Sequence, residues 1–121
     1  MSQLLRIYAL DIDDGTVVFG CVPDESMYNG TGTIHGGLAC GLLDFVCSCA
    51  LLTTLPEGKV MTSVELKVNF LKAIHSGSGR LRAVGKVVKA GARIGFTEGK
   101  VTDVHGAVVA TATSSLLIFD S

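Results

Sequence analysis

Short runs of alternating apolar and polar residues make up most of the chain, and one long apolar segment interrupts them. Near the N-terminus, Ile7–Asp13 and Thr16–Cys21 are rich in β-forming residues, and the turn residues Asp14 and Gly15 separate them. This spacing predicts a β-hairpin. Residues 23–33, which follow, have the composition of a loop.

The long apolar segment covers residues 34–55 and predicts a single helix. It contains no proline, so we expect the helix to begin near Gly36 and to end between residues 53 and 55, before Pro56. Large apolar side chains surround nearly all of it, which predicts a helix buried on every side. Because Asp44 and several glycines interrupt the segment, we interpret it as a core helix and not as a membrane span.

Beyond the helix the apolar period changes to two. Val64, Leu66, Val68 and Phe70 alternate with polar residues, as on a half-buried strand. Turn sequences then separate three further strand segments, at residues 80–89, 93–103 and 107–119. The order of two strands, a helix and four strands in a meander predicts an α+β fold, with one helix against an antiparallel sheet of five to six strands.

Length and composition predict a single domain over residues 1–121, since 48% hydrophobic content is enough to form a core. A net charge of -1 gives no support to nucleic-acid binding. The N-terminus has no signal-peptide pattern and the four cysteines do not have metal-ligand spacing, so we expect a cytoplasmic protein with reduced thiols and no membrane partner.

The cations are unevenly distributed, because seven of the ten lie between Glu65 and Glu98 with no acidic residue among them. Such a stretch either attracts a ligand that carries phosphate or forms the solvated face of a hairpin. The seven are Lys67, Lys72, Arg80, Arg82, Lys86, Lys89 and Arg93.

Asp44 is the only carboxylate in the helical segment, and no cation lies within one turn of it. A carboxylate in apolar surroundings is unfavourable unless it is paired, hydrogen-bonded or used in chemistry. Its neighbours at helical steps of three and four are small, which leaves room for a ligand or for a second helix. In a purely structural alternative, Asp44 only accepts hydrogen bonds. These neighbours are Gly37, Cys40, Gly41, Cys47 and Ser48.

The triplet His35, Gly36 and Gly37 lies at the start of this helix. Backbone amides at a helix N-terminus attract negative charge, and glycines let a ligand approach the backbone closely. These amides are suited to hold the oxyanion that forms when a thioester carbonyl is attacked. The alternative is a glycine-rich start to the helix that serves packing alone.

The string NGTGTIHGGLACGLLDFVCSCALL, which begins at Asn29, resembles the hotdog-fold acyl-CoA thioesterases of the phenylacetate-pathway and 4-hydroxybenzoyl-CoA type. Those proteins carry an amide residue, then HGG, then an acidic residue on the central helix. Here the amide lies six residues before His35, and Asp44 lies nine residues after it. The similarity covers residues 15–119 and includes the strand TSVELKVNFLKA.

The resemblance implies that Asp44 is the general base or the nucleophile and that the Gly36 amide polarises the thioester carbonyl. Asn29 and Ser63 match positions that hold the attacking water or orient the acid, and Ser48 matches a hydroxyl that orients water. His35 is expected to shape the loop. Strict alternation, however, turns Ser63 away from the helix of its own subunit, so it must face a partner or lie at a bulge.

The implied substrate is an acyl-CoA, whose acyl group passes Gly37, Cys40 and Gly41 while Lys89 and Arg93 meet the coenzyme A phosphates. Coenzyme A is then part of the substrate, and neither a cofactor nor a metal is expected. The resemblance also implies a homodimer joined edge to edge through its sheets, with the active sites at the interface. Many members pair further into tetramers.

Two other functions remain open from the sequence. The same fold can bind acyl-CoA as a sensor or carrier without cleaving it. A hotdog dehydratase or hydratase would instead use a histidine with the helix acid, here His35 with Asp44, to move a proton at carbon. The presence of Asp44 argues against the first alternative, and the spacing of HGG argues against the second.

Overall fold

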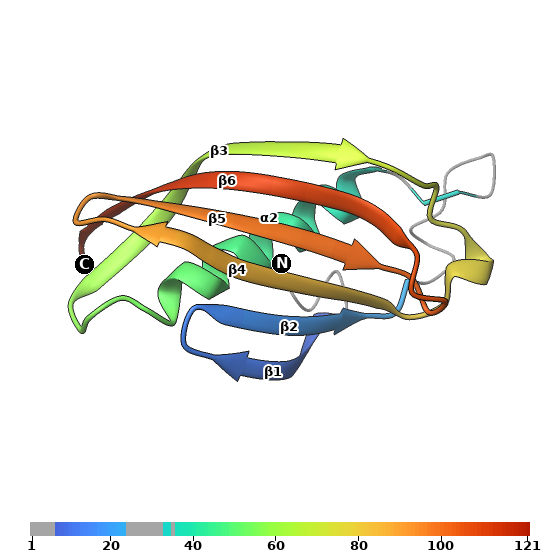
Figure 1. Cartoon of the computed structure of the whole chain (residues 1–121), viewed down its shortest axis with the longest axis horizontal. Helices are drawn as coiled ribbons and strands as arrows, with labels where there is room; N and C mark the ends of the chain where they lie inside the picture. The colour runs from blue at the N-terminus through green and yellow to red at the C-terminus, as the bar shows by residue number, and fades with distance from the viewer. Residues whose placement is uncertain (1–6, 24–32, 35) are drawn as a thin grey trace.

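The computed structural model describes residues 7–23, 33–34 and 36–121. In this part of the chain one long helix lies against a six-stranded antiparallel sheet (Figure 1). The predicted α+β fold is therefore confirmed. The elements are β1 (Ile7–Asp13), β2 (Thr16–Cys21), the helix α2 (Gly36–Leu52), β3 (Lys59–Phe70), the short 3-10 helix η2 (Ser76–Ser78), β4 (Leu81–Ala90), β5 (Ile94–Thr102) and β6 (Val108–Asp120).

The sheet order is β1-β2-β4-β5-β6-β3, so the predicted meander of four strands is wrong in one connection. Strands β4, β5 and β6 do form a meander, but β3 pairs with β6, and β4 pairs with β2. The connection between β3 and β4, residues 71–80, is long enough to cross over and includes η2. Strand β3 therefore lies at one edge of the sheet and β1 at the other.

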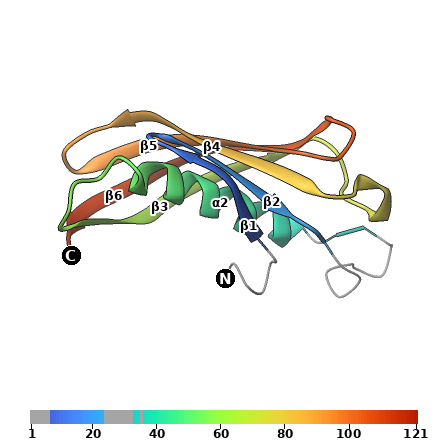
Figure 2. The same cartoon turned by 90° about the horizontal axis from the view of Figure 1, so that it is seen from below.

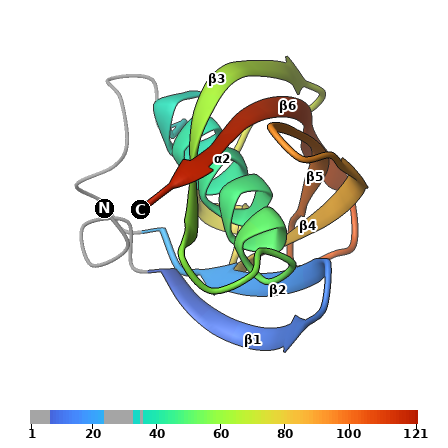
Figure 3. The ribbon, with the colours of Figure 1, turned by 90° about the vertical axis from the view of Figure 1, so that its left-hand side faces the viewer.

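The sheet curves around α2, as the views from below and along the sheet show (Figures 2 and 3). Close contact is possible because Gly85 of β4 and Gly99 of β5, which are paired across the two strands, lie beneath the helix. A Cβ atom on Gly85 would lie 2.1 Å from the carbonyl oxygen of Val46. The main core lies between the two layers and includes Leu42, Leu43, Val46, Leu81 and Val101.

A bulge in β3 changes which side chains face the helix. Ser63 pairs with Leu116 and Glu65 with Ser115, so Val64 is an extra residue on β3. Val64 is 62% exposed, which corrects its predicted inward position, whereas Leu66 and Val68 pack against the core as predicted. The bulge is the reason that Ser63 faces α2 of its own chain.

The helix is not buried on every side, contrary to the prediction. Gly36 and Gly37 are exposed, and several later residues on the face of Asp44 are only half-buried in the single chain. The apolar composition of α2 therefore exceeds what its own sheet covers. No helix in the described ranges is long and apolar enough to span a membrane. The half-buried residues are Cys40, Gly41, Asp44, Phe45, Ser48 and Cys49.

Candidate active site

A chain of two hydroxyl groups leads to the carboxylate of Asp44. Ser63 Oγ donates a hydrogen bond to Asp44 Oδ1 over 2.6 Å, and Ser48 Oγ lies 3.3 Å from Ser63 Oγ. A serine hydroxyl has one proton, and that of Ser63 is directed to the carboxylate, so Ser48 donates to Ser63. Ser48 is one helical turn beyond Asp44, and the β3 bulge supplies Ser63.

The Asp44 carboxylate keeps hydrogen-bonding capacity after this contact. Across the described residues, no cation forms an ion pair with it and no second donor contacts it. A carboxylate has about four lone-pair sites, so it has room to accept a proton from a bound water. The side chain is half-buried and lies on the accessible face of α2. The structure thus presents the carboxylate to a ligand that approaches from outside the chain.

The predicted path past Gly37, Cys40 and Gly41 follows this same face, where all three residues are exposed or half-buried. Cys47, which shares the helical spacing, is instead fully buried under the sheet. Burial raises the pKa of the Cys47 thiol to about 11, which makes it a core residue and not a nucleophile.

The start of α2 is held by a short antiparallel bridge. Ile34 N donates to the carbonyl of Ile74 over 2.8 Å, and Thr33 pairs with His75. The ring of Phe70 lies beside Gly36, where an added Cβ would come within 3.2 Å of it. Gly36 itself is exposed at the first position of the helix. Asn29 and His35, both predicted site residues, lie outside the described residues.

Lys89 and Arg93, the predicted phosphate contacts, flank the turn between β4 and β5 and are both exposed. Gly95, two residues beyond Arg93, lies against Leu51 near the C-terminal end of α2. The single chain therefore places these cations beside the end of the helix that is remote from Gly36. It does not bring them together with Asp44.

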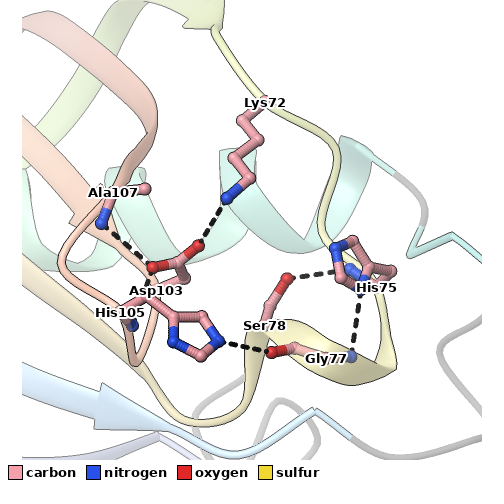
Figure 4. A network of polar contacts seen from close by, with 7 residues as sticks. All are labelled: Lys72, His75, Gly77, Ser78, Asp103, His105 and Ala107. Carbon is pink, nitrogen blue, oxygen red and sulfur yellow. Dashed lines mark hydrogen bonds and ion pairs between the residues drawn. The ribbon is translucent and has the colours of Figure 1, made fainter.

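The sequence did not indicate a second hydrogen-bonded carboxylate, Asp103, which Figure 4 shows with its donors. Asp103 Oδ1 accepts hydrogen bonds from the amides of His105 and Ala107 over 2.9 and 3.0 Å, and Oδ2 lies 3.1 Å from Lys72 Nζ. Burial of the carboxyl favours its neutral form, but these three donors outweigh it and lower the pKa of Asp103. Lys72 and Asp103 are 31 residues apart, and no local pattern signalled the pair.

The described residues contain no group of three or more histidine, cysteine or acidic side chains arranged to hold a metal ion. The chemistry available on the accessible face of α2 is that of a carboxylate, two hydroxyl groups and the amides at a helix N-terminus. These are the groups needed to activate water against a carbonyl and to hold the resulting oxyanion.

The thioesterase superfamily matches residues 31–110, which are 80 of the 121 residues. The chain therefore belongs to the thioesterase superfamily, and it is a thioester hydrolase. Human acyl-coenzyme A thioesterase 13 is 29% identical over 98 residues, which cover 81% of this chain and 69% of the human protein.

Solved structures share the fold. The PaaI protein from the phenylacetic acid degradation operon of E. coli has a TM-score of 0.91 at 21% identity, over 99% of this chain and 84% of PaaI. The protein smu.793 from Streptococcus mutans, solved with bound acetyl-CoA, has a TM-score of 0.86 at 22% identity, over 95% of this chain and 90% of that protein. The hotdog fold expected from the sequence is thereby confirmed.

Proposed function

We propose that this thioester hydrolase cleaves acyl-CoA to a free acid and coenzyme A, with Asp44 as its central carboxylate. The observation that carries the proposal is the 2.6 Å hydrogen bond from Ser63 to Asp44 on the accessible face of α2. One oxygen is oriented by Ser63 while the carboxylate retains room for water. Superfamily membership and the acetyl-CoA bound to a protein of the same fold support the substrate class.

The proposed site is completed by a second copy of the chain. Gly36 and Asp44 are eight residues apart on α2, or about 12 Å along the helix axis at 1.5 Å per residue. The carbonyl must lie about 3 Å from its donor, and the attacking water about 3 Å from the base. A donor and a base separated by 12 Å on one helix are poorly placed for this, whereas Gly36 of the partner subunit can approach Asp44 from outside.

The edge strand β3 is the proposed contact between the two copies. It is twelve residues long, and in the described part of the chain its outer edge pairs with no strand. Backbone groups on such an edge readily pair with another strand. Joining β3 to β3 of the partner also covers the half-buried face of α2, which its own sheet leaves open. This arrangement agrees with the edge-to-edge dimer that the resemblance implies.

In the first chemical route Asp44 takes a proton from water, and the hydroxide adds to the thioester carbonyl. The amide of Gly36 of the partner subunit holds the negative charge on the former carbonyl oxygen. The intermediate collapses, the carbon–sulfur bond breaks, and the proton on Asp44 passes to the leaving thiolate. The products are a carboxylic acid and the coenzyme A thiol.

In the second route Asp44 itself attacks the carbonyl and expels the thiolate, which leaves an acyl anhydride that water then hydrolyses. Single turnover in ¹⁸O-water distinguishes the routes. Direct attack by water places ¹⁸O only in the released acid. Nucleophilic attack followed by hydrolysis at the Asp44 carbonyl places ¹⁸O in Asp44 and an unlabelled carboxylate oxygen in the product. Hydrolysis at the acyl carbonyl would instead label only the acid, so trapping of the anhydride identifies that case.

The test of the proposed function is thiol release from a panel of aryl, short, medium and long acyl-CoAs. The native protein is compared with Asp44→Ala and Asp44→Asn, and unfolding midpoints confirm that each variant is folded. Turnover by the native protein that collapses in both variants supports the proposal. Binding of acyl-CoA without turnover by the native protein would favour a sensor. Addition of water to an enoyl-CoA would favour a hydratase.

A further inference from the structure

A pocket of about 360 Å³ lies at the N-terminal end of α2. Its wall includes Gly36 and the ring of Phe70, and Lys72 is the only charged residue among the described residues that line it. Most of the remaining wall is aliphatic and includes Ile34, Ile74 and Val109. A ligand that reaches the amide of Gly36 therefore shares this pocket with one cation.

Lys72 is held in place from two directions, and Figure 4 shows one of them, the contact with Asp103. Its backbone amide donates to the carbonyl of Val109 over 3.2 Å, and its ammonium lies 3.1 Å from the carboxylate of Asp103. The Asp103 side chain is 1% exposed, whereas that of Lys72 is 45% exposed. The buried carboxylate of Asp103 therefore fixes the position of the Lys72 ammonium, and the lysine side chain remains accessible.

The ammonium has binding capacity beyond this pair. It carries three N–H donors, and one contact to Asp103 is recorded among the described residues. The Oδ1 atom of Asp103 is already satisfied by two backbone amides, so the carboxylate does not depend on Lys72 for all of its hydrogen bonds. Lys72 also lines the pocket beside Gly36.

We propose that Lys72 binds an anionic group of the thioester ligand in this pocket, an inference that rests on the proposed function. The pocket volume of about 360 Å³ lies near the small end of the range for ligand sites, which suits a short acyl group. A carboxylate at the far end of such an acyl group would reach Lys72 while its thioester carbonyl lies at Gly36. The favoured substrates are thus CoA monothioesters of short dicarboxylic acids.

Coenzyme A itself is a second source of the same anionic chemistry, through its diphosphate. The long pantetheine arm separates the diphosphate from the thioester. If the diphosphate binds Lys72, the pantetheine arm therefore occupies the pocket in place of the acyl group. Three probes distinguish the two sources: glutaryl-CoA, the methyl ester of glutaryl-CoA, and the glutaryl thioester of N-acetylcysteamine. The first carries the carboxylate and the diphosphate, the methyl ester lacks the carboxylate, and the N-acetylcysteamine thioester lacks the whole nucleotide with its phosphates.

The experiment measures dissociation constants by titration calorimetry in the Asp44→Ala background, so that binding is observed without turnover. Lys72→Met is compared with Lys100→Met, a matched change at an exposed lysine of β5. We expect Lys72→Met to weaken glutaryl-CoA and the N-acetylcysteamine thioester about 10-fold, with little effect on the methyl ester. Lys100→Met should leave all three unchanged, and Lys72→Arg should retain most of the affinity.

If the diphosphate is the anion, Lys72→Met weakens both CoA ligands equally and spares the N-acetylcysteamine thioester, which still supports an anion site. Equal loss of affinity for all three ligands, or no loss for any of them, would overturn the proposal.

If Lys72→Met fails to fold, the dissociation constants of the Asp44→Ala protein alone provide the test. Equal affinity for glutaryl-CoA and its methyl ester would then refute a site for the acyl carboxylate. Absence of thiol release by the native protein is a separate result and refutes the proposed function only.

Discussion

Asp44 and Asp103 are two carboxylates in the same small domain, but their surroundings differ. Asp103 is almost fully buried and accepts hydrogen bonds from two backbone amides and one ammonium. Asp44 is half-buried, and its one described hydrogen bond comes from the neutral hydroxyl of Ser63. One carboxylate is saturated with donors and one is not.

This difference fits a structural role for Asp103 and the catalytic role that we propose for Asp44. When a carboxylate accepts several hydrogen bonds, the donors stabilise its charged form, and little capacity is left for a new partner. A carboxylate with a single oriented hydrogen bond keeps its basicity available for a water or a substrate. Hydrogen-bond saturation and burial therefore both distinguish the two acids.

The largest expected effect is the loss of activity in Asp44→Ala. Removal of the general base should lower kcat by about 10³-fold, because proton transfer by a positioned side chain contributes this much. The unfolding midpoint should stay the same or rise, since groups placed for chemistry often cost stability. Steady-state thiol release and thermal unfolding measure the two quantities. A variant with native kcat would show that Asp44 is only structural.

Ser63→Ala should reduce kcat about 10-fold, because one hydrogen bond to a charged group is lost while the carboxylate remains. Ser63→Thr is the matched control, since it retains the hydroxyl at the bulge. The KM values should change less than kcat, because Ser63 donates its hydrogen bond to Asp44. Equal activity of the alanine and native proteins would contradict the role of the hydroxyl chain.

Asp103→Asn should change the dependence of stability on pH. The pKa of Asp103 is lowered in the folded state, so its ionised form stabilises the fold above the unfolded pKa of about 4, and this contribution is lost as pH falls through the lower folded value. The native protein should therefore exceed Asp103→Asn in unfolding midpoint at pH 7, and the gap should shrink below about pH 4. A gap that is constant from pH 7 to pH 2 would exclude this linkage.

Ser48→Ala should have the smallest effect, a reduction of kcat by roughly 3-fold. Its hydroxyl lies 3.3 Å from Ser63 Oγ and reaches Asp44 only through that residue. In the Ser63→Ala background the same change should have almost no further effect, since the hydroxyl chain is already broken. A double-mutant cycle on kcat measures this coupling, and fully additive losses would argue against a chain.

Local patterns in the sequence were sufficient to predict the helix and the strands and to select Asp44 as a candidate site residue. The predicted first hairpin and helix start match β1, β2 and α2, because turn chemistry, proline and apolar period act over a few residues. The lone charge among small helical neighbours also pointed to the face that the structure leaves accessible. The excess of apolar residues on α2 was visible as well, although it was interpreted as burial within one chain.

The tertiary structure alone decided which distant residues meet. The pairing of β3 with β6 and the bulge at Val64 depend on how the strands fit around the helix, and that bulge turned Ser63 toward Asp44. The pair of Lys72 and Asp103 likewise joins two segments that have no shared local pattern. Periodicity specifies the face of each element, whereas contacts between elements depend on packing and register, which are properties of the whole fold.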